Sequence, residues 1–111
     1  MGEKAPFFQT VNQSTKLRTI LNYKLIIRRG YEVTIGKVGT LEVDFVASKA
    51  DEIVYYQVSA TIMDEKTKER ELRPLQSITD NYPKYILTMD NTVFNDFSGI
   101  KVKNIIDFLL E

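Results

Sequence analysis

The polar side chains best suited to chemistry lie on two neighbouring segments that alternate like strands. Asp44 lies within EVDFV at 42–46, and Gln57 and Ser59 end the run IVYYQVS at 53–59. Because polar side chains on a central strand need hydrogen-bond partners, we expect Asp44 and Gln57 to share a small polar pocket. An acid on one strand, followed by a polar pair ending the next, is the skeleton of a metal-dependent site that hydrolyses phosphodiesters.

Much of the chemistry of such a site is missing. Phosphodiester hydrolysis by this arrangement needs two acids that hold Mg²⁺ and a lysine that orients or activates water. Gln57 offers only a neutral carbonyl oxygen, and Ser59 carries no positive charge. We therefore predict no metal site. An active Mg²⁺-dependent enzyme would have to recruit another acid, such as Glu32 or Glu42.

Length and composition narrow the remaining choices. The 111 residues predict a single domain, and the chain contains no cysteine and no histidine. Disulfides, thiolate chemistry, His-ligated zinc and histidine general bases are thereby excluded. No segment approaches the roughly 20 apolar residues that span a bilayer. The first residues do not resemble a secretory signal, so we expect a cytoplasmic protein without a membrane partner.

The charges balance overall but are unevenly distributed. Fifteen Lys and Arg face fifteen Asp and Glu, so the whole chain should exert no strong pull on nucleic acid. Basic residues nevertheless concentrate in the first predicted helix, and this densest cluster comprises Lys16, Arg18, Lys24, Arg28 and Arg29. The cluster is either a solvated helix face or a surface for weak binding to phosphate or to an acidic partner.

The first half of the chain predicts one helix and an antiparallel meander. Residues 1–13 show no periodicity and read as an extended lead-in, and a single domain follows at 14–111. Apolar spacing predicts a helix of about four turns that Ser14 caps and Gly30 ends. Alternating segments at 31–35, 41–45 and 53–58 predict three strands, and the tight turns between them favour antiparallel pairing.

The second half predicts a crossover helix and a return to the sheet. Residues 64–78 read as a helix that Asp64 caps and that Pro74 kinks or restarts. A strand at 84–89 should then lie parallel to the central strand. A turn at 96–99, a short strand at 100–103 and a closing helix capped by Asn104 complete the order αβββαβ(β)α. This is an α/β fold with a mixed sheet of four to five strands flanked by helices.

Several phrases together resemble a known family. RRGYEV, EVDFV, QVS and NYPKY, within residues 17–110, look like the C-terminal domain of prokaryotic AAA-type ATPases. That domain is similar to the PD-(D/E)XK, or restriction-endonuclease-like, nucleases. The resemblance implies a restriction-endonuclease-like fold and an attached ATP-binding domain. This chain has no Walker motif, so it resembles a detached fragment or a short stand-alone copy.

The resemblance also assigns positions to the nuclease motif. Asp44 corresponds to the family's second-motif acid, Gln57 to the next acid and Ser59 to the lysine. The family often has a glutamate in the first helix, and the corresponding residue in this chain is Thr19. One acid of the vestigial site remains, which implies a catalytically inactive nuclease-like accessory or interaction domain without a cofactor. Its partner would be an attached ATPase domain or another protein. The alternatives are a nucleic-acid-binding module without cleavage and an active Mg²⁺-dependent nuclease, and the oligomeric state is left open.

Overall fold

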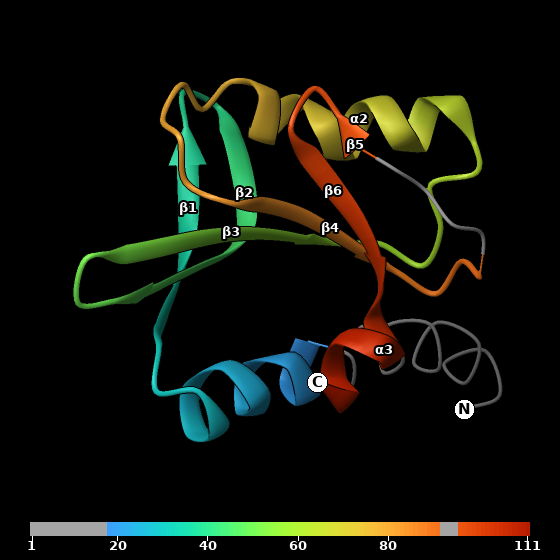
Figure 1. The fold of residues 1–111 in the computed structure, drawn as a ribbon. Helices are drawn as coiled ribbons and strands as arrows, with labels where there is room; N and C mark the ends of the chain where they lie inside the picture. The colour runs from blue at the N-terminus through green and yellow to red at the C-terminus, as the bar shows by residue number, and fades with distance from the viewer. Residues whose placement is uncertain (1–17, 92–95) are drawn as a thin grey trace, which may run out of the picture.

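The computed structural model describes residues 18–91 and 96–111, which form one mixed sheet with helices on both faces. The six strands lie in the order β1-β2-β3-β4-β6-β5. In Figure 1, α2 covers the upper face of the sheet, and the first helix and α3 lie side by side beneath it. The expectation of a mixed α/β sheet flanked by helices is confirmed, although the sheet has six strands instead of four or five.

The first three strands form the predicted antiparallel meander. They are β1 (Glu32–Val38), β2 (Leu41–Lys49) and β3 (Glu52–Val58), and β2 pairs with both neighbours. The β1–β2 turn places Gly39 at a φ of +63°, where a residue without a side chain is favoured.

The rest of the sheet is parallel at its centre, as the helical crossover predicts. Helix α2 (Glu65–Gln76) connects β3 to β4 (Lys84–Thr88), which lies parallel to β3. Strand β6 (Ile100–Asn104) lies parallel to β4. The additional strand, β5 (Asp96–Phe97), occupies the start of the predicted 96–99 turn and pairs with β6 across a tight hairpin.

The helix boundaries follow the local signals closely. Residues 18–23 are α-helical and continue into a π-helical turn, η1 (Lys24–Arg28), which Gly30 ends at a φ of +76°. The predicted Ser14 cap and the 1–13 lead-in lie outside the described residues. Asp64 caps α2 by accepting the N–H of Thr67, and the helix runs through Pro74 as one element without restarting. Helix α3 (Ile105–Leu110) begins at the predicted cap.

Two apolar cores lie on the two faces of the sheet. The core beneath it joins the first helix and α3 to the strands and contains Leu21, Leu25, Phe45, Ala47, Val54, Tyr56, Leu87, Ile105 and Phe108. The core above it lies against α2 and contains Val43, Ile62, Leu72, Leu75, Ile86 and Ile100. Burial of these side chains is the main stabilising contribution that a domain of this size can make.

A β-bulge in β2 breaks the alternation that the sequence predicts. Thr34 pairs with Val46, but Gly36 pairs with Val43, so Asp44 and Phe45 together oppose a single residue of β1. Val43 consequently joins the upper core and Phe45 the lower one. Regular alternation along β2 would place Val43 and Phe45 on the same face, and the bulge separates them.

Candidate functional site

The backbone pairing between strands β2 and β3 stops at the bulge. From there on, side chains accept the backbone N–H groups that the ladder would otherwise pair. The regular ladder ends at Phe45 and Tyr56. Past this pair, the N–H of Val58 donates to Oδ2 of Asp44 at 2.9 Å, and the N–H of Asp44 donates to Oε1 of Gln57 at 2.7 Å. We call this arrangement of Asp44, Gln57 and Val58 the fork. It lies at the carboxyl end of β3, where parallel strands commonly present their functional groups.

Gln57 is suited to the fork because its side chain both accepts and donates hydrogen bonds. It is only 4 % exposed, and its Nε2 donates to the backbone carbonyl of Glu71 in α2 at 3.2 Å. An ionised glutamate could accept the N–H of Asp44 but could not donate to that carbonyl. The Gln57 amide therefore joins β2, β3 and α2.

Asp44 also contacts the first helix. A guanidinium nitrogen of Arg18 lies 3.3 Å from Oδ1 of Asp44, and the guanidinium carbon lies 5.9 Å from the centre of the Phe45 ring. Arg18 therefore contacts both residues of the bulge. Each carboxylate oxygen of Asp44 thus has a partner within the protein.

A second carboxylate near the fork was missed by the sequence reasoning. Burial first, and then the negative charge of Asp44, raise the pKa of Glu71, while Arg70 and Arg18 oppose the shift. Glu71 precedes the fully buried Leu75 by one helical turn, so it lies on the inward side of α2. This spacing was the available signal, although it does not reveal which strand the carboxylate approaches.

The other residues of the nuclease pattern do not join the fork. The hydroxyl of Ser59 donates to the carbonyl of Thr61, and Thr19 is exposed on the first helix. Glu32 is exposed on the edge strand β1, and Glu42 is exposed opposite Lys37. Among residues 18–91 and 96–111, no group of three or more acids is arranged to hold a metal ion.

Two residues of the basic cluster, Lys24 and Arg29, connect the first helix to the C-terminal segment. Lys24 donates to the carbonyls of Leu109, at 3.0 Å, and of Glu111. Arg29 pairs with the Glu111 carboxylate at 3.4 Å and lies 4.8 Å from the Phe108 ring centre. Arg28 is exposed without an ion pair to any described residue, and Lys16 lies outside the described residues. The predicted cluster is therefore not one free basic surface.

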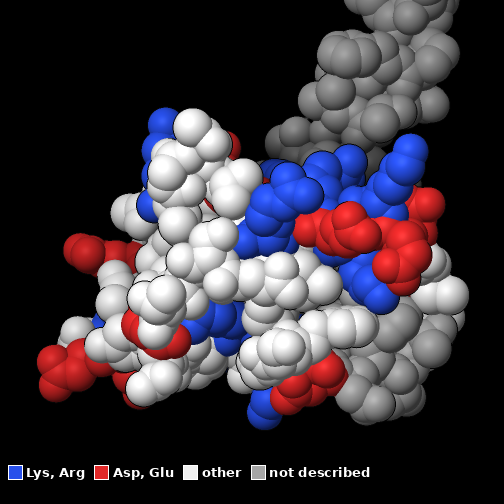
Figure 2. Space-filling view, turned by 90° about the horizontal axis from the view of Figure 1, so that it is seen from above, with Lys and Arg blue, Asp and Glu red and all other residues white. Residues whose placement is uncertain are grey.

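The opposite face of the molecule also mixes the two signs of charge. Figure 2 looks down on the α2 side, where Lys and Arg side chains gather together with Asp and Glu side chains. Within α2 itself, Lys68 pairs with Glu65 at 2.9 Å. Such an interleaved face gives little long-range attraction for a polyanion.

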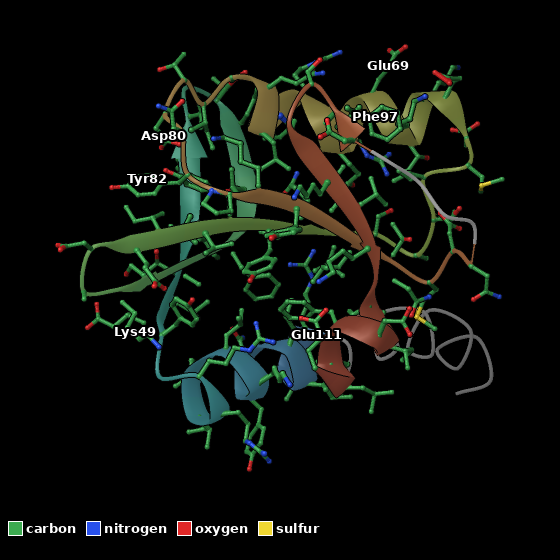
Figure 3. All side chains as sticks on the ribbon, in the orientation of Figure 1. Lys49, Glu69, Asp80, Tyr82, Phe97 and Glu111 are labelled. Carbon is green, nitrogen blue, oxygen red and sulfur yellow. The ribbon has the colours of Figure 1, made fainter. Side chains whose placement is uncertain are left out.

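A second polar cluster fixes the loop between α2 and β4, where Figure 3 shows Asp80 and Tyr82 close together. Nζ of the buried Lys84 donates to a carboxylate oxygen of Asp80 at 2.9 Å and to the carbonyl of Tyr82 at 2.9 Å. Tyr55 donates its hydroxyl to Asp80 at 2.6 Å. Burial first, and then Asp80, raise the pKa of Tyr55 to about 12. Two cavities of about 340 and 350 Å³ flank this loop, yet its charged groups already satisfy one another.

Among the described residues, no helix combines the length and apolar character that crossing a membrane requires.

Comparison with known proteins gives one relative and no family. None of the known protein-family models matches the chain, and no solved structure matches it. A Haemophilus influenzae protein described only as uncharacterised is 40 % identical over 100 residues, which is 90 % of this chain and 24 % of that protein. The chain therefore spans about a quarter of the length of the relative it matches.

Proposed function

We propose that the chain is a catalytically inactive, restriction-endonuclease-like module that serves as an accessory or interaction domain related to the C-terminal region of AAA-type ATPases. The use of the Asp44 carboxylate carries this proposal. One of its oxygens accepts the Val58 N–H and the other lies against Arg18. The side chain that would hold Mg²⁺ in an active nuclease thus serves as a structural connection.

The arrangement of Gln57 supports the same conclusion. Holding Mg²⁺ takes carboxylates together with bound waters. At the fork the second position is an amide whose oxygen and nitrogen are both engaged, by Asp44 and by the carbonyl of Glu71. A glutamine at this position, where the nuclease pattern has an acid, favours hydrogen bonds within the protein over binding of a cation. We accordingly expect the protein to need no cofactor and to act in the cytoplasm.

A cleavage assay tests the absence of catalysis. The purified chain should not cut DNA or RNA in millimolar Mg²⁺ or Mn²⁺, because it lacks the second acid and the lysine. Asp44→Asn is the matched control, since it removes the one remaining acid. Time-dependent cleavage by the wild type that disappears in Asp44→Asn would replace our proposal with an active nuclease.

The link to an ATPase rests on the motifs named above and is supported by the relative's length. In Haemophilus influenzae the matching region belongs to a much longer chain, as expected of an accessory module. We expect the part of that protein outside the match to contain a phosphate-binding loop of the form G-x-x-x-x-G-K-[ST]. Its absence there, together with an inability of the full-length Haemophilus protein to hydrolyse ATP, would contradict the ATPase assignment.

Nucleic-acid binding without cleavage is the second candidate, favoured by the exposed side chain of Arg28 and by Arg18, whose side chain is 44 % exposed. Few phosphates could be neutralised, so affinity should be weak and should decrease only shallowly with salt. Fluorescence anisotropy with a labelled oligonucleotide can compare wild type, Arg28→Ala and the double variant Arg28→Ala/Arg29→Ala. Binding that survives high salt, or that neither variant weakens, would exclude this surface.

A further inference from the structure

The sheet has a long edge that no strand of residues 18–91 or 96–111 covers. Strand β1 is outermost in the strand order and pairs with β2, whereas the opposite edge, β5, has only two residues. Strand β1 has seven residues and contains no proline. Proteins commonly prevent pairing at an edge by keeping the edge strand short, bulged or interrupted by proline. The β1 edge therefore remains available to a further strand.

The register of the sheet determines which backbone groups point outward from this edge. The two-residue turn between β1 and β2 makes Val38 and Leu41 a hydrogen-bonded pair. Hydrogen-bonded positions alternate along an antiparallel pair, so every second residue of β1 directs its N–H and C=O at β2 and the others direct them outward. Counting back from Val38, the outward residues are Val33, Ile35 and Lys37.

The turn between β2 and β3 gives the same assignment on the far side of the bulge. It makes Lys49 and Glu52 a hydrogen-bonded pair of β2 and β3. The preceding residue, Ser48, therefore directs its backbone groups at β1, where its partner is Glu32. Glu32 lies an even number of positions from Val38, so the bulge in β2 leaves the alternation along β1 intact. Free N–H and C=O groups thus recur regularly along the whole strand.

A second copy of β1 satisfies all of these groups. When two β1 strands run antiparallel about a two-fold axis at Ile35, the two Ile35 residues lie opposite each other, and Val33 lies opposite Lys37 of the second copy. Each outward N–H then meets an outward C=O. The Ile35 side chain, which is 68 % exposed in the single chain, packs against its counterpart on the axis.

The charges of β1 favour the antiparallel arrangement. Glu32 begins the strand and Lys37 lies near its end, and both side chains are exposed. Antiparallel pairing brings the Glu32 end of each copy to the Lys37 end of the other. Parallel pairing of two copies would instead place like charges beside each other, which is destabilising.

We propose that two copies of this chain associate through β1, so that their sheets become continuous across a two-fold axis at Ile35. The association needs neither an attached ATPase nor the loss of catalysis, and therefore goes beyond the proposed function. One strand from each copy supplies a small interface, so the dimer is weak and depends on protein concentration.

Sedimentation velocity at protein concentrations up to about 1 mM, where even weak complexes form, measures the association. Ile35→Pro removes an outward N–H and no hydrogen bond within the single chain, so it should raise the dissociation constant by about tenfold or more. Ile35→Val keeps both the N–H and an apolar side chain and should dimerise like wild type. Ile106→Ala, at an exposed position on α3, is the control for association through the helices and should also dimerise like wild type.

Amide hydrogen exchange locates the interface. Raising the protein concentration should selectively slow exchange at the outward residues Val33, Ile35 and Lys37, and not at Thr34 or Gly36, whose N–H groups already point at β2. Cooperative thermal unfolding establishes that each variant is folded. If the proline variant is not, Ile35→Lys places like charges on the axis and should weaken the dimer in its place.

Two results would overturn the proposal. The first is a wild type that stays monomeric at the highest concentration, which would leave the β1 edge to a strand of a different polypeptide. The second is a dimer that neither Ile35→Pro nor Ile35→Lys weakens, because the contact would then lie elsewhere on the molecule. Cleavage of nucleic acid by the wild type would contradict the proposed function and would leave the dimer measurement as a separate outcome.

Discussion

At the residue scale, the carboxylate of Asp44 takes the place of a backbone carbonyl as a hydrogen-bond acceptor. Where β2 bulges away from β3, the Val58 N–H has no strand partner, and a carboxylate oxygen 2.9 Å away takes that role. A buried N–H without an acceptor is costly, so the acid is explained by hydrogen bonding alone. The position of Asp44 therefore has a structural explanation that needs no catalytic role.

We predict that Asp44→Ala destabilises the protein by about 1 to 3 kcal/mol, because it leaves the Val58 N–H without an acceptor. Asp44→Asn should cost less, since its amide oxygen can still accept that bond and the lost pair with the exposed Arg18 contributes little. Urea denaturation of the two variants measures the difference. Equal costs for Ala and Asn would assign the role to charge instead of to hydrogen bonding.

Glu71 gives the fork a dependence on pH. Burial, and then Asp44, raise the pKa of this carboxyl above its ordinary value of 4.5, so the folded protein holds the proton more tightly than the unfolded chain does. The stability that the protonated form contributes is fully present below pH 4.5 and is lost as the pH rises through the raised pKa.

Replacing Glu71 with Gln removes this loss. We expect Glu71→Gln to be more stable, relative to wild type, at neutral pH than below pH 4.5, so its free energy of unfolding should exceed that of wild type by more at neutral pH. Denaturant unfolding across the acid range measures it, with Glu69→Gln on an exposed position of the same helix as control. A relative stability that does not change with pH would show that Glu71 ionises as freely in the fold as outside it.

At the element scale, the bulge requires a glycine on the neighbouring strand. A Cβ built at Gly36 would lie 2.6 Å from Cγ2 of Val46 and 3.3 Å from Cβ of Val43. These are the two valines that the bulge brings to the same face of β2. The close approach of β1 is thus part of the geometry in which the Asp44 carboxylate reaches the N–H of Val58.

Gly36→Ala should therefore destabilise the protein by about 1 to 3 kcal/mol through overpacking. Thr34→Ala, an exposed position on the same strand, should change stability by no more than about 0.5 kcal/mol. Urea denaturation again gives both values. A Gly36→Ala variant as stable as wild type would mean that β1 can move away from the valines without cost.

The elements that the sequence predicted best are those fixed by local signals. The caps Asp64 and Asn104 each accept backbone N–H groups at the predicted helix starts, and Gly30 ends the first helix. The antiparallel meander and the parallel return after α2 likewise follow from turn lengths and connection rules.

The features that local signals did not predict depend on distant partners. The bulge was hidden because Val43 and Phe45 are both buried, which imitates regular alternation, although they belong to different cores. The two-residue β5 exists only because β6 pairs with it. The nearness of Glu71 to Asp44 depends on where α2 crosses the sheet, which spacing along one helix does not determine.

At the scale of the whole molecule, we predict that divalent ions do not stabilise the wild-type fold. A ligand at about a hundred times its dissociation constant stabilises by roughly 2.7 kcal/mol. In a domain of this size that would raise Tm by roughly ten degrees or more. Because Arg18 already neutralises Asp44, millimolar Mg²⁺ or Mn²⁺ should produce no shift beyond a general salt effect. A saturable rise in Tm that Asp44→Asn abolishes would show that the wild type binds the ion, and would favour the alternative of an active nuclease.

The contact between the first helix and α3 also sets an order of assembly. The meander has short connections and can form from neighbouring residues, whereas Lys24 must find the carbonyl of Leu109, 85 residues away along the chain. Leu21 and Leu25 likewise complete their core only with Phe108. During synthesis the first helix therefore emerges early but stays without its final neighbours until almost the whole domain has left the ribosome. Until then its apolar side chains can pack only against the meander, and the part of their core that α3 supplies stays open, which favours contact with a chaperone during that interval.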